Sequence, residues 1–260
     1  MGAMKEQDSR LQSTHLVEIF NRIWSNMEND PNETQRRIMQ ELTSVRWRKI
    51  QKEVVDKFGS FKGVRVVEVG AGRGDISLCF SLKGAHVLLI DQSRAALKIA
   101  KRVFEQFGQE AQFISADVFN LPKKLRNRFD IAVSFGFAEH FTGTSRKEVF
   151  MIHHDLVRKG GLSIISVPNA HCLPYTVHRK IAMWLHRWKF GVEVPFTPLE
   201  LKVIGSSAGF NSCKIIGSSF VKDFNDFLIH IIIPSFSGNF ETASFLDDWF
   251  GYALVFLGHK

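Results

Sequence analysis

The sequence predicts an α/β fold, in which a doubly wound, mostly parallel seven-stranded sheet carries helices on both faces. Three observations support this prediction. From residue 64 onward, short apolar runs alternate with stretches of helical periodicity, as in βαβ units with right-handed crossovers. A glycine-rich turn joins the first apolar run to the first of these helices. With 260 residues, 45% of them hydrophobic, the chain is long enough for one large core with appendages.

The residues that precede this repeat, 1–58, are expected to form an N-terminal helical extension. Apolar residues at helical spacing predict one helix over 11–27. The sequence Asn-Asp-Pro-Asn at 29–32 interrupts the pattern, and a second, longer helix is expected from there to about Phe58. The apolar stripe of this second helix consists of Ile38, Leu42, Val45, Ile50 and Val54.

The remainder of the chain, 59–260, is expected to contain the sheet. Its predicted strands are 64–69, 86–91, 111–115, 129–135, 162–167, 211–217 and 252–257. Its predicted helices are 75–83, 93–107, 145–158 and 198–208, with Ser93 as an N-cap and a capping box at Thr197–Glu200. Two aromatic-rich segments after the fifth strand, 171–196 and 218–250, are expected to be insertions that shape a binding pocket. Core packing beneath a lid is the alternative for both.

The loop after the first strand has the composition of a cofactor site. Residues 66–75 read VVEVGAGRGD, with glycines on alternate positions that let the backbone turn sharply and approach a ligand. The helix that follows directs its free N–H groups toward the same place. Asp91 ends the next strand, 21 residues after Gly70, which is the distance at which a carboxylate meets the ribose of a bound adenosine.

The glycine spacing distinguishes between classes of cofactor. A dinucleotide fingerprint would place its third glycine at 75, where this chain has Asp75. Glu68 stands just before the loop, and a carboxylate there suits a cationic amino group better than a pyrophosphate. Together with Asp91 and the later sequence Ala-Asp-Val at 116–118, this pattern resembles the class I S-adenosylmethionine (SAM)-dependent methyltransferases. The resemblance extends from about residue 64 to 167.

This resemblance implies SAM as the cofactor, with S-adenosylhomocysteine (SAH) as its product. It implies that Asp91 binds the ribose, with Gln92 near the adenosine, and that Asp117 binds the adenine amino group. The full set of expected cofactor-binding residues is Glu68, Gly70, Ala71, Gly72, Gly74, Asp91, Gln92, Asp117, Val118 and Phe135. In the resembled family, N-terminal helices often cover the cofactor, so residues 1–58 are expected to act as a lid or simply to pack against the sheet.

The acceptor side is expected around the loop after strand four, because ligands bind outside the carboxyl ends of parallel strands. His140 is the candidate general base for a hydroxyl or amine, and a histidine that only braces the loop is the alternative. The other expected acceptor-pocket residues are Phe137, Glu139, His171, Tyr175 and Trp184. Methyl transfer is an in-line displacement in which alignment alone is worth ~7–11 kcal/mol, so no base is strictly required.

These features predict methyl transfer to an oxygen or nitrogen of a small, partly apolar or aromatic acceptor. A net charge of +8 leaves RNA or protein open as the acceptor, although no RNA-binding module is recognisable. A non-catalytic SAM-binding partner subunit is a further alternative.

Other sequence features concern metals, membranes and the cellular compartment. The three cysteines are far apart and no metal-ligand spacing is present, so neither a metal nor a disulfide framework is expected. No apolar run approaches the ~18 residues of a transmembrane helix, and the apolar stretch 227–234 is too short to cross a bilayer. A cytoplasmic protein is therefore expected.

Overall fold

The computed structural model describes residues 17–27, 30–222 and 242–260. Residues 11–16 of the first predicted helix lie outside the described residues, and residues 17–25 are helical. Much of the second predicted insertion, including the apolar stretch 227–234, also lies outside them.

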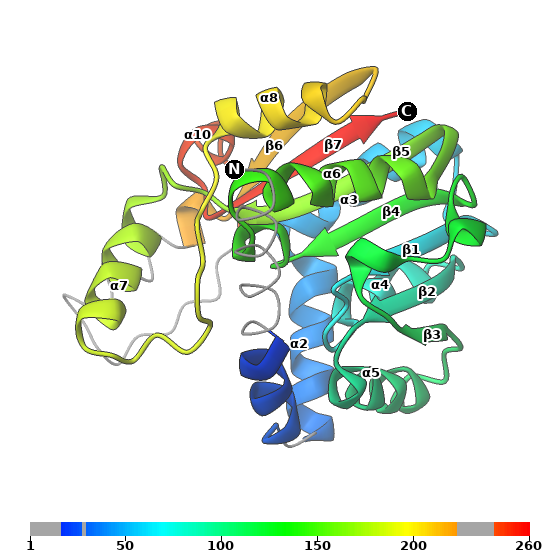
Figure 1. Ribbon diagram of the computed structural model, residues 1–260, viewed down its shortest axis with the longest axis horizontal. Coiled ribbons are helices and arrows are strands. Elements are labelled where there is room, and N and C mark those ends of the chain that lie inside the picture. Colours follow the sequence, from blue (N-terminus) through cyan, green and yellow to red (C-terminus); the bar gives the residue numbers. More distant parts are fainter. Residues whose placement is uncertain (1–16, 28–29, 223–241) are drawn as a thin grey trace, which may run out of the picture.

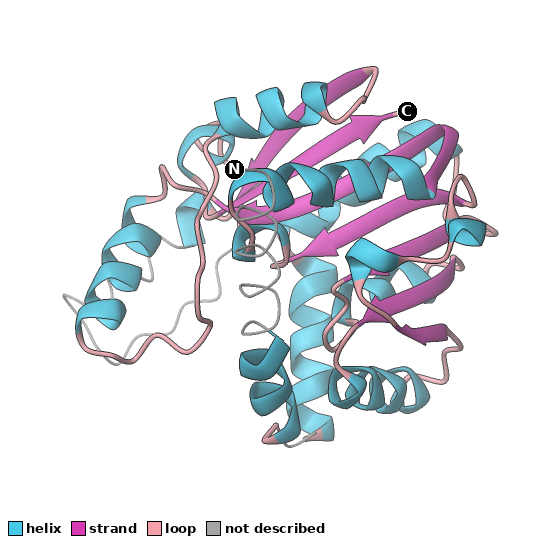
Figure 2. Cartoon of the chain, in the orientation of Figure 1, coloured by secondary structure: helices cyan, strands magenta, loops and turns pink. Residues whose placement is uncertain are grey.

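The predicted seven-stranded sheet is confirmed (Figure 2). Its strands are β1 (Arg65–Val69), β2 (His86–Asp91), β3 (Gln112–Ser115), β4 (Phe129–Phe135), β5 (Val157–Pro168), β6 (Ser212–Ser218) and β7 (Ala253–His259). The strand order is β3-β2-β1-β4-β5-β7-β6, and β7 runs antiparallel to both of its neighbours. The order reverses between β1 and β4, which creates a crevice at the carboxyl ends of these strands.

Helices cover both faces of the sheet, as predicted (Figure 1). One face packs against α3 (Val45–Phe58), α4 (Asp75–Leu82) and α5 (Arg94–Gln106), and the other against α6 (Gly143–Leu156) and α8 (Pro198–Ser207). The remaining elements are α2 (Pro31–Thr43), α7 (Leu173–Trp184), α10 (Asp247–Phe250) and the short 3-10 turns η1 (Val118–Asn120), η2 (Lys123–Leu125) and η3 (Ala138–His140). Side chains of successive strand residues point to opposite faces of the sheet. Val66 packs on the face covered by α3, α4 and α5, and Val67 packs on the opposite face.

The prediction of one long second helix is wrong, because Ser44 divides it into α2 and α3. Ser44 has extended backbone angles, and its hydroxyl accepts a hydrogen bond from Trp47 N at 2.9 Å, so it caps the start of α3. Trp47 itself is fully buried and meets the edge of Phe80 at 5.1 Å between ring centroids. The beginning of α2 follows the predicted break, with Asp30 as N-cap and Pro31 as the first helical residue.

The boundary between α6 and β5 also differs from the prediction. The helix was expected to reach residue 158, but α6 ends at Leu156 and β5 begins at Val157. Val157 pairs with Phe129, and the register shifts before Ile131 pairs with Leu162. The two glycines at 160–161 therefore form an irregularity inside a long strand instead of ending a helix, and Gly160 has the positive φ of +77° that this requires.

The predicted N-caps are confirmed at both sites. Ser93 Oγ accepts from Ala96 N at 3.3 Å, and Thr197 Oγ1 accepts from Glu200 N at 3.1 Å. The Glu200 carboxylate forms an ion pair with Arg146 Nε at 2.8 Å, which links α8 to α6. In the part of the chain that the structure describes, no helix is both long and apolar enough to cross a membrane.

Candidate active site

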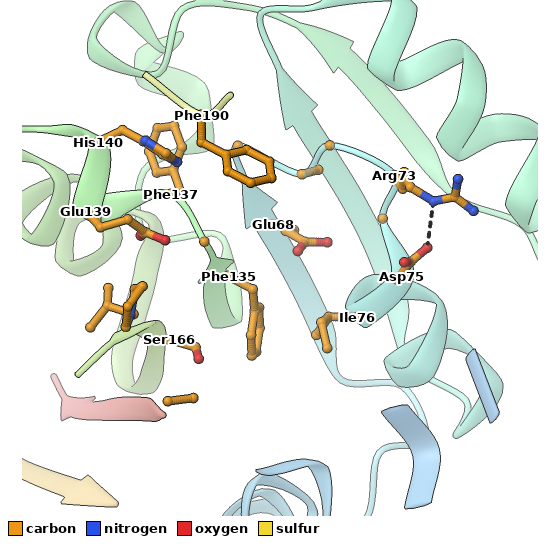
Figure 3. A pocket seen from close by; sticks show the side chains of 18 of the residues that line it. Glu68, Arg73, Asp75, Ile76, Phe135, Phe137, Glu139, His140, Ser166 and Phe190 are labelled. Atoms are coloured by element: carbon orange, nitrogen blue, oxygen red, sulfur yellow. Dashed lines mark hydrogen bonds and ion pairs between the residues drawn. The ribbon is translucent and has the colours of Figure 1, made fainter. Parts of the chain in front are cut away.

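A large pocket of about 1380 Å³ lies at the carboxyl ends of β1, β2, β4 and β5 (Figure 3). Its walls also include residues of the N-terminal helices, of the 171–196 insertion and of the turn before β7. All ten expected cofactor-binding residues line it, and so do Phe137, Glu139 and His140. The switch point of the sheet therefore brings together residues that are far apart in the chain, such as Glu68 and His140.

The glycine loop is shaped by close contacts at all three alternate glycines, which have φ of +65°, +52° and +70°. A Cβ on Gly70 would lie 2.2 Å from Phe137 Cδ2, and one on Gly72 would lie 2.9 Å from Trp24 Cζ2. A Cβ on Gly74 would lie 2.4 Å from Leu89 Cδ2, against the core. The first two glycines thus leave space on the pocket side, and the third allows α4 to pack closely on the sheet.

Glu68 is a buried carboxyl group on the wall of the pocket, with 3% of its surface exposed. Its Oε2 atom has no hydrogen-bond partner. Burial raises the pKa of Glu68 to about 8, with a further contribution from the nearby carboxylate of Asp75. Such a group is poorly stabilised as an anion by the protein alone, and a cationic amino group in the pocket would supply the missing partner.

Asp91 holds the glycine loop in place. Its Oδ2 atom accepts from Gly72 N at 2.8 Å, and its Oδ1 atom accepts from Ser93 N at 2.8 Å. Burial nevertheless raises the pKa of Asp91. Each carboxylate oxygen has a second lone pair, so both can still accept from ribose hydroxyls.

Asp117 caps the 3-10 turn η1 beside the pocket. Its Oδ1 atom accepts from Phe119 N at 3.0 Å, and its Oδ2 atom accepts from Asn120 Nδ2 at 2.6 Å. Val118 follows it and is buried, whereas Gln92, at the end of β2, is exposed. These residues form the end of the pocket that lies next to β2 and β3.

The loop after β4 forms the opposite wall (Figure 3). Phe137 lies over Gly70 and meets the edge of Phe141 at 4.9 Å between ring centroids. Glu139 is buried, its Oε2 atom has no hydrogen-bond partner, and burial raises its pKa to about 8. The ring of His140 meets the edge of Phe20 at 4.9 Å, and burial lowers the pKa of His140.

A hydrogen bond to the insertion orients His140. Its Nδ1 atom lies 2.9 Å from the carbonyl oxygen of Val192, to which it donates in the neutral ring. The strand-four loop and the insertion are joined a second time by Val194 N, which donates to Glu139 O at 2.8 Å. The insertion therefore forms part of the wall that holds Glu139 and His140.

Three of the expected acceptor-pocket residues, His171, Tyr175 and Trp184, do not line the pocket. Trp184 is 79% exposed at the end of α7, which extends beyond the carboxyl ends of the strands (Figure 1). Tyr175 is buried beneath the wall, where its hydroxyl donates to Glu193. The residues of the insertion that do line the pocket are Trp188, Phe190 and Glu193.

The N-terminal helices supply lining residues that no sequence motif marked, among them Phe20, Trp24 and Arg46. They are attached to the glycine loop by two polar contacts. Arg73 Nη2 donates to Thr34 Oγ1 at 2.8 Å, and Arg37 Nη2 forms an ion pair with Asp75 Oδ2 at 2.8 Å. The resemblance led to the expectation that N-terminal helices lie near the cofactor, but no sequence pattern indicated these individual residues.

Within residues 17–27, 30–222 and 242–260, no group of three or more His, Cys, Asp or Glu side chains has an arrangement that could hold a metal ion.

Comparison with known proteins identifies the class of this site. Residues 66–161 match the family model described as a methyltransferase domain. A ubiquinone biosynthesis O-methyltransferase of Pseudomonas putida is 26% identical over 170 residues, which cover 64% of this chain and 72% of that protein. The protein of the same name from Azotobacter vinelandii is 27% identical over 162 residues, covering 61% of this chain and 69% of that protein.

Solved structures share the fold over nearly the whole chain. A Thermotoga maritima SAM-dependent methyltransferase, described as a possible histamine N-methyltransferase, has a TM-score of 0.60 at 18% identity and covers 95% of this chain and 100% of its own. Magnesium protoporphyrin IX methyltransferase of Synechocystis with bound SAH has a TM-score of 0.59 at 16% identity, covering 96% and 100%. By its sequence match and its relatives, the chain contains a SAM-dependent methyltransferase domain. Its fold is the Rossmann-like fold of solved class I enzymes of this kind.

Proposed function

We propose that this methyltransferase transfers the methyl group of SAM to an oxygen or nitrogen of a small, partly apolar or aromatic acceptor. The observation that carries the proposal is one continuous pocket of about 1380 Å³, with the glycine loop and Asp91 at one end and aromatic rings around Glu139 and His140 at the other. Pockets for a single drug-sized ligand usually have about 300–1,000 Å³. This pocket is therefore large enough for a donor and an acceptor side by side.

The residues at the β1 and β2 end fit SAM. Glu68 offers an unpartnered buried oxygen to the amino group of the donor, and Asp91 offers its free lone pairs to the ribose hydroxyls. We assign the adenine to Asp117 and Val118, with Gln92 at the rim, and the methionine part to the glycine loop. When bound, SAM supplies a methyl group on a positively charged sulfur.

The residues at the other end align the acceptor and exclude water. Phe20, Phe141, Trp188, Phe190 and Tyr252 surround it with aromatic surface. Alignment of this kind accounts for most of what a methyltransferase must do. We assign His140 as the base, acting through Nε2, because its Nδ1 side is directed to the Val192 carbonyl.

Two observations indicate the type of acceptor. The Pseudomonas and Azotobacter relatives are O-methyltransferases, which supports transfer to oxygen as one possibility for this chain. The aromatic walls support a small molecule over RNA or protein, since a macromolecular acceptor would need an open groove. A steep loss of substrate binding with added salt would favour RNA instead.

We also propose that residues 1–58 act as a lid on the domain formed by 59–260, and that the protein works in the cytoplasm. The lid is supported by the contact of Trp24 with Gly72 and of Phe20 with His140. The cytoplasmic location is supported by the three cysteines, all of which are free.

The proposed function is tested by measuring SAM binding calorimetrically and then screening small phenols and amines for SAH release. Binding of SAM together with SAH release that depends on the acceptor supports the proposal. Tight SAM binding with no turnover on any acceptor would instead support a non-catalytic partner subunit.

A further inference from the structure

Glu139 presents a buried carboxyl group with one unpartnered oxygen to the acceptor end of the pocket. Its side chain is 3% exposed, and its Oε2 atom has no hydrogen-bond partner. Figure 3 shows the carboxylate directed into the pocket, on the same side as His140. A buried polar atom in this state costs free energy unless a ligand completes its hydrogen bonding.

A second carboxylate, Glu193, lies on the same wall and is also buried. The Tyr175 hydroxyl donates to its Oε1 atom, and Arg179 donates to its backbone carbonyl. The next residue, Val194, donates its N–H to Glu139 O at 2.8 Å, which fixes the two backbones side by side. The two side chains are close enough for the charge of Glu193 to disfavour ionisation of Glu139.

The charge of Arg146 favours ionisation of Glu139, but Arg146 is paired with other groups. Arg146 forms an ion pair with Glu200 at 2.8 Å, and its other nitrogens donate to the backbone carbonyls of Phe141, Val194 and Pro195. Its guanidinium also stacks on Phe196 at 3.3 Å from the ring centroid. Among the residues that the structure describes, neither Glu139 nor Glu193 forms an ion pair with a cationic side chain.

Aromatic rings complete this part of the pocket. Phe20, Trp188, Phe190 and Tyr252 line the same space as the two carboxylates. Aromatic faces attract cations, and a cation between rings and carboxylates is the usual composition of a site for an ammonium group. We propose that Glu139 and Glu193 form the binding site for a protonated amine on the acceptor, which makes the acceptor an amine with an apolar or aromatic body.

The charge of the pair argues against other acceptors. The pair opposes binding of a phenolate by charge. A carboxylic acid would be repelled for the same reason. An ammonium group instead favours the ionised form of Glu139 beside Glu193 and gains two charge-assisted hydrogen bonds. The pair binds an amine in its protonated form, and this ammonium group gives one proton to His140 before the nitrogen lone pair attacks the methyl group.

This inference rests on the proposed function, and a binding experiment distinguishes the two. The enzyme is first saturated with SAH and then titrated calorimetrically with phenethylamine, 2-phenylethanol and 3-phenylpropionate, which share one aromatic ring and differ in the head group. We expect phenethylamine to bind at least about tenfold more tightly than the alcohol, and the acid not to bind. Failure of the proposed function would appear earlier, as a failure to bind SAH.

Substitutions test whether Glu139 and Glu193 are responsible for the preference for the amine. Glu193→Gln keeps an acceptor for Tyr175 but removes the charge, so it should reduce phenethylamine affinity by about tenfold and leave 2-phenylethanol unchanged. Tyr175→Phe should produce a smaller loss, because the carboxylate remains but is no longer oriented. Glu148→Gln, on the exposed surface of α6, is the matched control and should bind like the wild type.

Three results would overturn the inference. The first is equal or tighter binding of the alcohol, and the second is no binding of phenethylamine at millimolar concentrations. The third is a Glu193→Gln variant that keeps the preference for the amine, or that loses SAH affinity instead, which would assign the pair to the donor. A thermal melt of each variant confirms that it is folded.

Discussion

Asp91, the last residue of β2, accepts a hydrogen bond from the backbone N–H of Gly72 at 2.8 Å and so fixes the loop that follows β1. The same carboxylate accepts a hydrogen bond from the backbone N–H of Ser93, the N-cap of α5. One side chain thus joins two strand ends before any ligand is bound. The residue assigned to the ribose is also the residue that shapes the glycine loop.

This double role predicts a large effect for Asp91→Ala. Loss of the ribose contacts and of the Gly72 hydrogen bond should weaken SAM binding by roughly tenfold or more, the scale of one charge-assisted hydrogen bond. Calorimetry measures the affinity. Asp56→Ala removes an exposed carboxylate that pairs with Lys52 on α3, and it should leave the affinity unchanged. Equal SAM affinity in the wild type and the Asp91 variant would show that the ribose assignment is wrong.

If residues 1–58 act as a lid, substitution of Trp24 should change the rate at which SAM dissociates. The ring of Trp24 lies against Gly72, so Trp24→Ala should open the pocket and increase the dissociation rate of SAM several-fold. Stopped-flow fluorescence with excess SAH as competitor measures the rate. Trp184→Ala is the matched control, because that ring is 79% exposed and outside the pocket. If both variants release SAM at the wild-type rate, residues 17–27 do not act as a lid.

Much of the donor end could be predicted from the sequence because its determinants are local. Glycine at 70, 72 and 74 and acids at 68, 91 and 117 keep fixed distances along the chain from the strands that position them. The acceptor end is different. Phe20, Glu193 and Tyr252 come from three separate segments and meet only through tertiary packing, so no spacing indicates them. The division of the second helix at Ser44 was missed for another reason, since one serine inside a continuous apolar stripe does not by itself indicate a cap.

The two buried glutamates predict how stability depends on pH. Burial raises the pKa of Glu68 and Glu139 to about 8, whereas an unfolded glutamate titrates near about 4.3. Between these values the folded protein holds protons that the unfolded chain has released. The free energy of unfolding should therefore fall as the pH rises from about 5 to about 8, by up to ~1.4 kcal/mol per pH unit for each group.

Urea denaturation across this pH range checks the prediction. The groups that face Glu139 are Glu193 and Arg146, and those that face Glu68 are Asp75 and Asp91. Glu139→Gln removes one titrating group and should make the decline shallower, while Glu148→Gln on the surface of α6 should not. A free energy of unfolding that rises over the same interval would contradict the raised pKa values.

The contacts of Arg146 predict that its substitution lowers the free energy of unfolding. Arg146 is buried, it pairs with Glu200 at 2.8 Å, and it donates to three backbone carbonyls. Two of these, those of Val194 and Pro195, belong to the insertion, which they hold against α6. Arg146→Met should lower the free energy of unfolding by about 3 kcal/mol, because those carbonyls lose their donor inside the protein. Urea denaturation measures the change. Arg158→Met, at a half-exposed ion pair with Asp130, should cost much less, and equal losses in the two variants would contradict this account.

His140 predicts separate outcomes for two substitutions, because its two ring nitrogens have different roles. Nδ1 donates to the Val192 carbonyl at 2.9 Å, and Nε2 is assigned as the base. His140→Ala removes both functions and should lower turnover by ~10²-fold. His140→Asn offers a donor to Val192 but has no basic nitrogen, so it should be equally slow while restoring acceptor affinity. Steady-state kcat and KM distinguish these effects. If the Asn variant recovers most of the turnover, His140 only positions the loop, and alignment within the aromatic pocket is sufficient for methyl transfer.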